Sequence, residues 1–296
     1  MERMMENTEK RMDGERLAVI ENIAAALRDG DTFRKVELHD PVVTDGDIKR
    51  VIVPFDNLKR KPLNKLKALI ARLIAGKMTK KLNVHTEIVG LENACSVEGG
   101  AIITCNHFNP VDNTVVRVLA EKCGRAKKFD IIVQETNIFM KGFFGFLMRN
   151  CYTLPITSRS MSYMAKNFRA ALNARLGRGD FVLIYPEQEM WFNYKKPRPL
   201  REGAYHMAYE AGVPIIPCFI EMRETDGIGP DGFYEVRHTL HVLEPIYPDT
   251  SKPKKDERER MLALDAKAKR ECYESVYGYP PSDDFLPERD IAGYRK

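Results

Sequence analysis

Short apolar runs, each followed by polar residues, recur through the middle of the chain. They span residues 101–104, 129–134, 152–156, 181–185 and 213–219, and residues 233–243 alternate between apolar and polar side chains. Runs of this length predict buried strands, and alternation predicts a strand with one covered face. Residues 161–176 and 203–211 repeat apolar side chains at helical spacing. Strands that alternate with helices indicate an α/β domain.

The two flanks of this domain have different patterns. Residues 15–28 have helical spacing, and residues 36–55 are interrupted by turn-forming residues, which predicts short extended pieces and turns. We treat residues 1–57 as an N-terminal appendage. After the last strands, residues 223–232 predict a Gly-rich loop and residues 256–273 a charged helix, and we expect the last twenty residues to be loosely ordered. Residues 251–296 are thus a C-terminal helix and tail.

A basic amphipathic helix is predicted between the appendage and the first strand, within residues 58–83. Leucine and isoleucine recur at helical spacing over residues 62–82, and six lysines and arginines lie between them. Residues 57–86 contain nine Lys and Arg and no Asp or Glu. Such a helix can lie at an anionic membrane surface, or it can pack on the core with a solvated basic face. The uniform charge favours the membrane.

The segment 137–151 is unusually rich in large apolar side chains. It contains four phenylalanines besides leucine, isoleucine and methionine. One helix face rarely buries so many. We expect this segment to line a tunnel for an acyl chain or to contact lipid, and an ordinary core helix is the alternative.

Composition and charge narrow the class of protein. Of the 296 residues, 44% are hydrophobic and 30% are charged, which is typical of a folded protein with a surface in water. No run approaches the roughly 18 apolar residues of a membrane-spanning helix, and the N-terminus lacks a signal peptide, so we expect a cytoplasmic protein. The net charge of +5 comes from one basic segment, which indicates a local anionic contact and no nucleic acid.

The six cysteines are scattered through the chain. No C-x-x-C pair is present, which disfavours a zinc site and a disulfide framework, and H-E-x-x-H is absent as well. We therefore expect reduced, mostly buried cysteines and no metal.

The first candidate chemistry lies at the end of the strand 101–104. His107 follows this strand in a predicted turn, and Asp112 falls in the first turn of the next helix, for which Asn109 is the expected cap and Pro110 the first residue. A carboxylate at this place can orient an imidazole and stabilise its protonated form, as a general base requires. The alternative is that Asp112 only caps the helix.

A second polar stretch follows the strand 181–185. It reads Pro-Glu-Gln-Glu-Met-Trp over residues 186–191 and continues into a basic loop with Lys195, Lys196, Arg198 and Arg201. Open α/β sheets place ligand sites at the carboxyl ends of their strands. The sequence therefore predicts that residues from both strand ends contribute to one site.

Taken in order, four blocks resemble the glycerolipid acyltransferase family, which includes the 1-acylglycerol-3-phosphate acyltransferases. The family signature of a histidine, four residues and an aspartate is matched by His107 and Asp112. Residues 153–159 are similar to its second block, Tyr-Pro-Glu at 185–187 to its third, and Val-Pro-Ile-Ile-Pro at 213–217 to its fourth. The resemblance covers about residues 84–250, which we expect to form the acyltransferase domain.

This resemblance implies a mixed, mostly parallel sheet flanked by helices, and acyl transfer from a thioester to a free hydroxyl group. His107 would be the general base and Asp112 the residue that orients it, while Arg159 and Glu187 would help to bind the acceptor. The donor would be acyl-coenzyme A or acyl carrier protein, and no cofactor is implied. The acceptor would be a lysolipid, above all 1-acylglycerol-3-phosphate, which suggests a peripheral membrane enzyme of phospholipid biosynthesis.

The third block departs from the family in three residues. Gln188, Glu189 and Met190 stand where Gly, Thr and Arg usually follow. Losing an arginine removes a phosphate ligand, which Lys195, Lys196, Arg198 or Arg201 would have to replace unless they form only a solvated basic loop. Two alternatives remain open: a different amphipathic hydroxyl acceptor, such as a glycolipid or lipid precursor, and a lipid-surface binding protein without catalysis.

Overall fold

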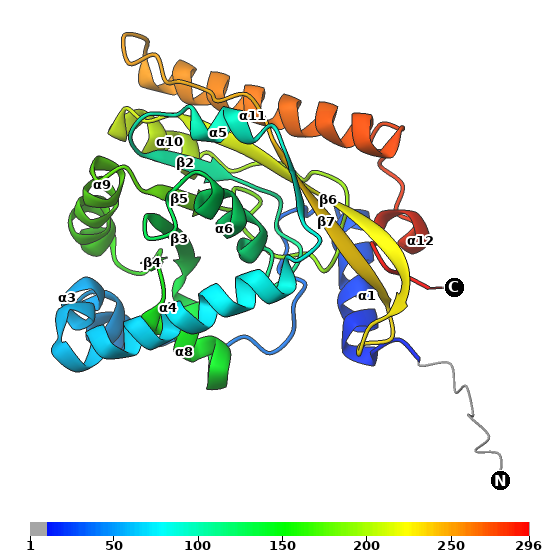
Figure 1. Cartoon of the computed structure of the whole chain (residues 1–296), viewed down its shortest axis with the longest axis horizontal. Helices are drawn as coiled ribbons and strands as arrows, with labels where there is room; N and C mark the ends of the chain where they lie inside the picture. The colour runs from blue at the N-terminus through cyan, green and yellow to red at the C-terminus, as the bar shows by residue number, and fades with distance from the viewer. Residues whose placement is uncertain (1–10, 296) are drawn as a thin grey trace.

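The computed structural model describes residues 11–295, and a seven-stranded sheet forms its centre (Figure 1). The strands are β1 (Glu87–Val89), β2 (Ala101–Thr104), β3 (Phe129–Gln134), β4 (Thr153–Ile156), β5 (Phe181–Ile184), β6 (Ile215–Ile228) and β7 (Tyr234–Val242). They lie in the order β1-β7-β6-β2-β5-β3-β4, and neighbours are parallel except for the antiparallel pair β6 and β7. The expected α/β fold with a mixed, mostly parallel sheet is therefore confirmed.

Helices cover both faces of the sheet. Side chains alternate along a strand, so Ile102 and Ile103 of β2 lie in different cores. Ile102 packs in the core with η2 (Tyr163–Phe168), α9 (Arg169–Gly177) and α10 (Gly203–Ala211), and Ile103 packs with α5 (Leu91–Cys95) and α6 (Asn113–Lys122). This cover on both faces explains why the strands read as continuous apolar runs.

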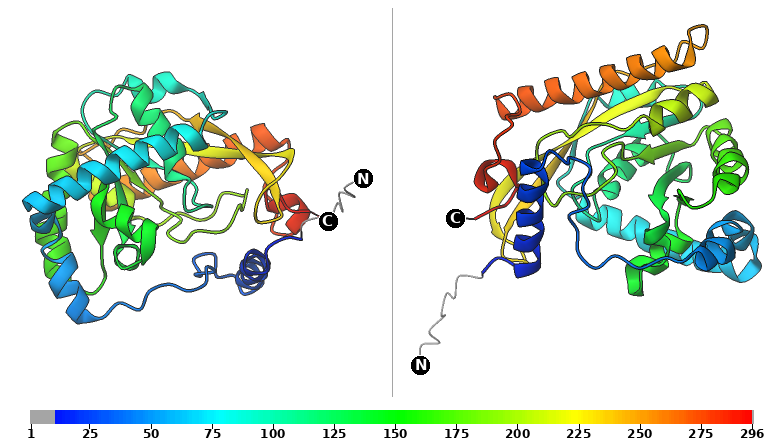
Figure 2. Two further views of the ribbon diagram at one scale, coloured as in Figure 1. Left: turned by 60° about the horizontal axis from the view of Figure 1, so that its bottom comes forward. Right: turned by 180° about the vertical axis from the view of Figure 1, so that it is seen from behind.

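The N-terminal part begins with α1 (Gly14–Arg28) and continues as an irregular segment, residues 29–44, which we call the strap. Figure 2 shows the strap running from α1 to the helices α2 (Asp45–Asp47), η1 (Ile48–Ile52) and α3 (Phe55–Arg60). The prediction of short extended pieces in residues 36–55 was wrong for its second half. Ile48, Ile52 and Phe55 have helical spacing and bury one helical face in the main core.

Helix α4 (Pro62–Leu82) has small residues toward the protein and large ones toward solvent. Ala68 and Ala71 are buried, whereas its leucines 63, 66, 69 and 73 are between 55% and 64% exposed. Helix α8 (Gly142–Asn150), which follows α7 (Glu135–Ile138), lies beside α4 (Figure 1). It exposes Phe143 and Phe144. Within residues 11–295, no helix combines the length and apolar character that crossing a membrane requires.

The C-terminal part is more ordered than the sequence suggested. Strand β6 runs to Ile228, where a Gly-rich loop was expected, because residues 223–228 pair with β7. The tail after α11 (Lys254–Tyr277) contains α12 (Pro287–Asp290) and then buries Ile291 and Ala292. The prediction of a loose tail was wrong, since a few apolar residues suffice to dock it.

One pair of cysteines forms a disulfide, contrary to the expectation that all are reduced. Cys95 at the end of α5 is bonded to Cys123, the residue after α6. The two lie 28 residues apart in the sequence and meet because α5 and α6 pack together. The cysteines at 105, 151, 218 and 272 are free, as expected.

Candidate active site

The ends of β2 and β5 bring the two polar stretches together. The strands are parallel neighbours, and Thr104 is paired with Ile184, the last residues of each. The chain beyond β2 therefore runs beside the chain beyond β5. This places His107 against Tyr185, whose rings stack with centroids 4.0 Å apart and planes 15° apart.

His107 and Asp112 are in direct contact. The imidazole Nδ1 lies 2.8 Å from Asp112 Oδ2, and the same oxygen accepts hydrogen bonds from the backbone N–H groups of Phe108 and Asn109. Helix α6 begins at Asn113, later than predicted, and the Asp112 side chain makes no capping hydrogen bond to it. The carboxylate thus holds the ring and its loop instead of capping the helix. With Nδ1–H directed at Asp112, Nε2 is the free acceptor of the imidazole.

Tyr185 is a third member of this group. Its hydroxyl donates a hydrogen bond of 2.6 Å to the other Asp112 oxygen, Oδ1. Burial and the negative charge of Asp112 raise the pKa of Tyr185 well above its usual value, so the hydroxyl stays protonated. The sequence interpretation missed this role. The available signal was its position directly after β5, the parallel neighbour of the strand that leads to His107.

Glu187 lies behind the histidine instead of facing an acceptor. Its Oε2 accepts a hydrogen bond from the backbone N–H of His107, and its Oε1 accepts one from the backbone N–H of Arg198. The Arg198 guanidinium lies 3.2 Å from the same buried carboxylate. Glu187 therefore ties the loop after β2 to the loop after β5.

A cavity of about 380 Å³ opens in front of His107. One wall is formed by Tyr185 and the residues after it, including Gln188, Glu189 and Met190. Gln188 has a φ of +67°, so the position that favours glycine in the related block keeps a left-handed backbone here. Another wall is the strap, which contributes Lys35 and residues 37–40. The sequence interpretation did not anticipate this wall, because the strap has no periodic pattern.

The sequence model of a family described as Acyltransferase matches residues 83–221, which include β2 to β5 and the whole group around His107. Residues 83–221, slightly less than half of the chain, therefore match the acyltransferase family. The predicted acyltransferase resemblance is confirmed over these residues. No curated protein matches the chain. Among solved structures, it is similar to the 1-acyl-sn-glycerophosphate (LPA) acyltransferase PlsC from Thermotoga maritima, with 14% identity, a TM-score of 0.46, and 90% of this chain and 96% of that chain covered.

The basic residues predicted to bind substrate in this acyltransferase lie in different surroundings. Lys195 and Lys196 are buried, 3.5 Å from Glu224 and 2.9 Å from Asp290, and Arg198 is buried against Glu187. None of these three lines the cavity. They are neither a solvated loop nor available cations, because each has an acidic partner.

Two further arginines complete the predicted set. Arg201 is exposed, lines the cavity and stacks on the Phe33 ring of the strap. Arg159 is not brought to the cavity; its side chain lies 3.4 Å from Asp45 and 3.7 Å from Glu135 at the surface. Of the basic residues predicted to bind substrate, only Arg201 therefore lines the cavity in front of His107.

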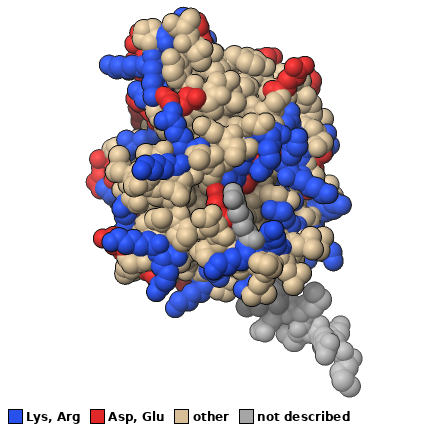
Figure 3. Space-filling model, turned by 90° about the vertical axis from the view of Figure 1, so that its left-hand side faces the viewer, with Lys and Arg blue, Asp and Glu red and all other residues tan. Residues whose placement is uncertain are grey.

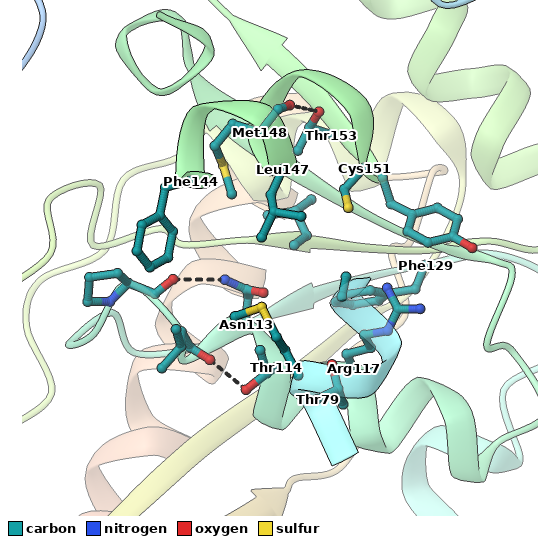
Figure 4. A pocket seen from close by; sticks show the side chains of 16 residues that line it. Thr79, Asn113, Thr114, Arg117, Phe129, Phe144, Leu147, Met148, Cys151 and Thr153 are labelled. Carbon is teal, nitrogen blue, oxygen red and sulfur yellow. Dashed lines mark hydrogen bonds between the residues drawn. The ribbon is translucent and has the colours of Figure 1, made fainter. Parts of the chain in front are cut away.

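A second, apolar cavity of about 60 Å³ adjoins the first in the acyltransferase domain (Figure 4). Phe144, Leu147 and Met148 of α8 form one side, and α4 and the beginning of α6 form the other. Phe144 and Met148 line both cavities. Within residues 11–295, no cluster of three or more His, Cys, Asp or Glu side chains is arranged to hold a metal ion.

Proposed function

We propose that this acyltransferase transfers a fatty acyl group from a thioester to a free hydroxyl group of a lysoglycerolipid. The observation that carries the proposal is the contact of His107 with Asp112 on the wall of a cavity that adjoins an apolar one. A larger cavity lined by both charged and apolar side chains, beside a smaller apolar one, matches the chemistry of a lipid with one reactive hydroxyl.

The proposed reaction needs no covalent enzyme intermediate. His107 Nε2 removes the proton of the acceptor hydroxyl as its oxygen attacks the thioester carbonyl. The tetrahedral intermediate then collapses, the carbon–sulfur bond breaks, and the imidazolium returns the proton to the leaving thiolate. Asp112 stabilises the imidazolium during the reaction, while Tyr185 and two backbone N–H groups hold Asp112 in place.

The finer proposal names 1-acylglycerol-3-phosphate as the acceptor. Arg201 supports it, because it lines the cavity, forms no ion pair with another described residue, and has a planar guanidinium that suits a phosphate. A second candidate is an amphipathic acceptor with a hydroxylated headgroup, such as a glycolipid. Glu37, Asp40 and Glu189 on the cavity walls favour it, since carboxylates repel a phosphate monoester and accept hydrogen bonds from hydroxyl groups.

For the donor, we propose acyl-coenzyme A or acyl carrier protein, with the acyl chain directed toward the apolar cavity under α8. Only the acyl group must enter the protein, so both carriers are compatible with this arrangement.

We further propose that the enzyme acts on the anionic cytoplasmic face of a membrane. Helix α4, with its outward leucines, packs against α8, which exposes Phe143 and Phe144. Lysines and arginines lie between these leucines in the sequence, and Figure 3 shows Lys and Arg side chains on the face that carries α3 and the beginning of α4. An apolar stripe flanked by cations is the surface that binds anionic lipid bilayers.

Replacing the histidine tests the proposed chemistry. We expect His107→Ala to lower the rate of acyl transfer by roughly 100- to 10,000-fold, the usual contribution of a general base. The measurement is release of the thiol from acyl-coenzyme A and acyl carrier protein with a panel of lysolipids, and exposed His85→Ala is the matched control. Equal turnover by wild type and His107→Ala would show that the dyad is not a catalyst and would favour the lipid-binding alternative.

A further inference from the structure

The strap lies outside the matched acyltransferase domain and yet forms a wall of its cavity. Three hydrogen bonds fix it there. The Trp191 indole donates to the carbonyl of Arg34, the Arg198 guanidinium donates to the carbonyl of Thr32, and the Asn22 amide donates to the carbonyl of Val36. Val36 is buried as well. The strap is therefore a preorganised wall, and Figure 2 shows the course of its backbone.

Glu37 is the residue of this wall with unused hydrogen-bonding capacity. Among the described residues it makes no hydrogen bond, and its contact is an ion pair with Arg16 at 3.7 Å. The other two carboxylates on the walls are engaged, because Asp40 pairs with Lys35 and Glu189 accepts a hydrogen bond from the Gln134 amide. A mostly buried carboxylate without a hydrogen-bond donor is costly unless a ligand supplies one.

A second polar atom of the same cavity is also without a partner. Thr136 of α7 lines this cavity, and its hydroxyl is buried and makes no hydrogen bond with a described residue. The last torsion of a glutamate side chain is broad, so Glu37 can turn either oxygen toward the cavity at little cost. Two unpaired polar groups in one cavity indicate a ligand with hydroxyl groups. A cationic headgroup fits less well, since Arg16, Lys35 and Arg201 line the same cavity.

We propose that Glu37 determines acceptor specificity by accepting a hydrogen bond from a second hydroxyl group, so that the preferred acceptor is a lysoglycerolipid with a hydroxylated headgroup. This inference rests on the proposed acyl transfer to a lysoglycerolipid. The strap binds the headgroup hydroxyl while His107 deprotonates the hydroxyl that is acylated. Arg201 pairs with the phosphate where the acceptor has one. 1-Acylglycerol-3-phosphate satisfies Arg201 but leaves Glu37 with its ion pair to Arg16 and no hydrogen-bond donor, so of the two acceptors proposed above the hydroxylated one is preferred.

The test compares three acceptors with wild type, Glu37→Met and Glu37→Gln. Lysophosphatidylglycerol has a phosphate and headgroup hydroxyls, 1-acylglycerol has a second hydroxyl alone, and 1-acylglycerol-3-phosphate has a phosphate alone. Methionine keeps the length of glutamate and removes both oxygens, whereas glutamine keeps one acceptor oxygen. Exposed Glu21→Gln on α1 is the matched control.

We expect Glu37→Met to lower kcat/KM for lysophosphatidylglycerol and 1-acylglycerol by roughly tenfold or more, the effect of losing a hydrogen bond to a charged group. Turnover of 1-acylglycerol-3-phosphate should stay within about twofold, and Glu37→Gln should recover most of the lost rate. Equal losses with all acceptors, or no loss with any, would overturn the role of Glu37 while leaving acyl transfer intact. Absence of turnover by wild type with every acceptor would instead overturn the proposed function.

Discussion

At the scale of single residues, the site is a chain of three side chains and not a pair. Asp112 uses one oxygen for His107 and the other for the Tyr185 hydroxyl, and the Tyr185 ring also supports the imidazole by stacking. A donor on Oδ1 withdraws part of the charge that would otherwise stabilise the imidazolium. Tyr185 is therefore a positioning residue that adjusts the strength of the base without touching the acceptor.

Replacing this hydroxyl separates its two contributions. In Tyr185→Phe the stacked ring remains, but Asp112 loses a donor and interacts more strongly with the imidazolium. We expect the acid limb of the kcat/KM profile to move to higher pH, and kcat at neutral pH to fall by roughly fivefold to tenfold with little change in KM. A pH–rate series measures both effects. The control is Tyr163→Phe, which removes a buried hydroxyl that donates to the Pro155 carbonyl and should leave the profile unchanged. An unchanged profile in both variants would show that the Tyr185 hydroxyl does not affect the strength of the base.

At the scale of elements, the sequence predicted those parts that have a regular pattern of apolar residues. The strands β2, β3 and β5 lie close to their predicted limits because they are short apolar runs, and the helices α1, α4 and α10 because apolar residues recur along them at helical spacing. The strap could not be predicted in this way, since single side chains and backbone carbonyls hold it. The disulfide of Cys95 and Cys123 was missed for a similar reason: it depends on tertiary packing and not on sequence spacing.

Helix α4 gives a prediction at this scale. Its outward leucines contribute little to folding while exposed, so replacing Leu66, Leu69 and Leu73 by glutamine should leave the melting temperature nearly unchanged. Binding to anionic liposomes should fall by roughly tenfold or more, because three apolar side chains no longer enter the interface. Cosedimentation at two salt concentrations measures it, and wild-type binding should weaken with salt. The control is Leu264→Gln, which replaces an exposed leucine on the distant helix α11. If liposome binding responds neither to the triple substitution nor to salt, α4 is an ordinary surface helix.

At the scale of the whole molecule, both ends of the chain close around the loop that follows β5. Ile20 and Ile23 of α1 pack in one cluster with Trp191 of that loop and Ile291 of the tail. The backbone at residues 290–292 also exchanges hydrogen bonds with residues 193–195. The loop in turn binds the strap and, through Glu187, the backbone of His107. The segments that the sequence presented as an appendage and a loose tail thus fix the geometry of the cavity.

The contribution of the tail can be tested at Asp290, which joins the tail to the loop after β5 through a buried ion pair with Lys196. Burial alone would raise the pKa of Asp290, but hydrogen bonds from Arg289, the Leu286 backbone and Lys196 outweigh it and lower the pKa. A lowered folded-state pKa means that the ionised carboxylate stabilises the protein above the unfolded-state pKa of about 4, and that this contribution is lost as the pH falls below it.

We expect Asp290→Asn to lower the free energy of unfolding by about 3 kcal/mol at pH 7, the usual cost of leaving a buried charge unpaired. Urea unfolding from pH 7 to pH 3 measures the difference, which should shrink at the acidic end, where wild type becomes protonated as well. The exposed neighbour Asp283→Asn should unfold like wild type at every pH; if Asp290→Asn does the same, the tail does not brace the site.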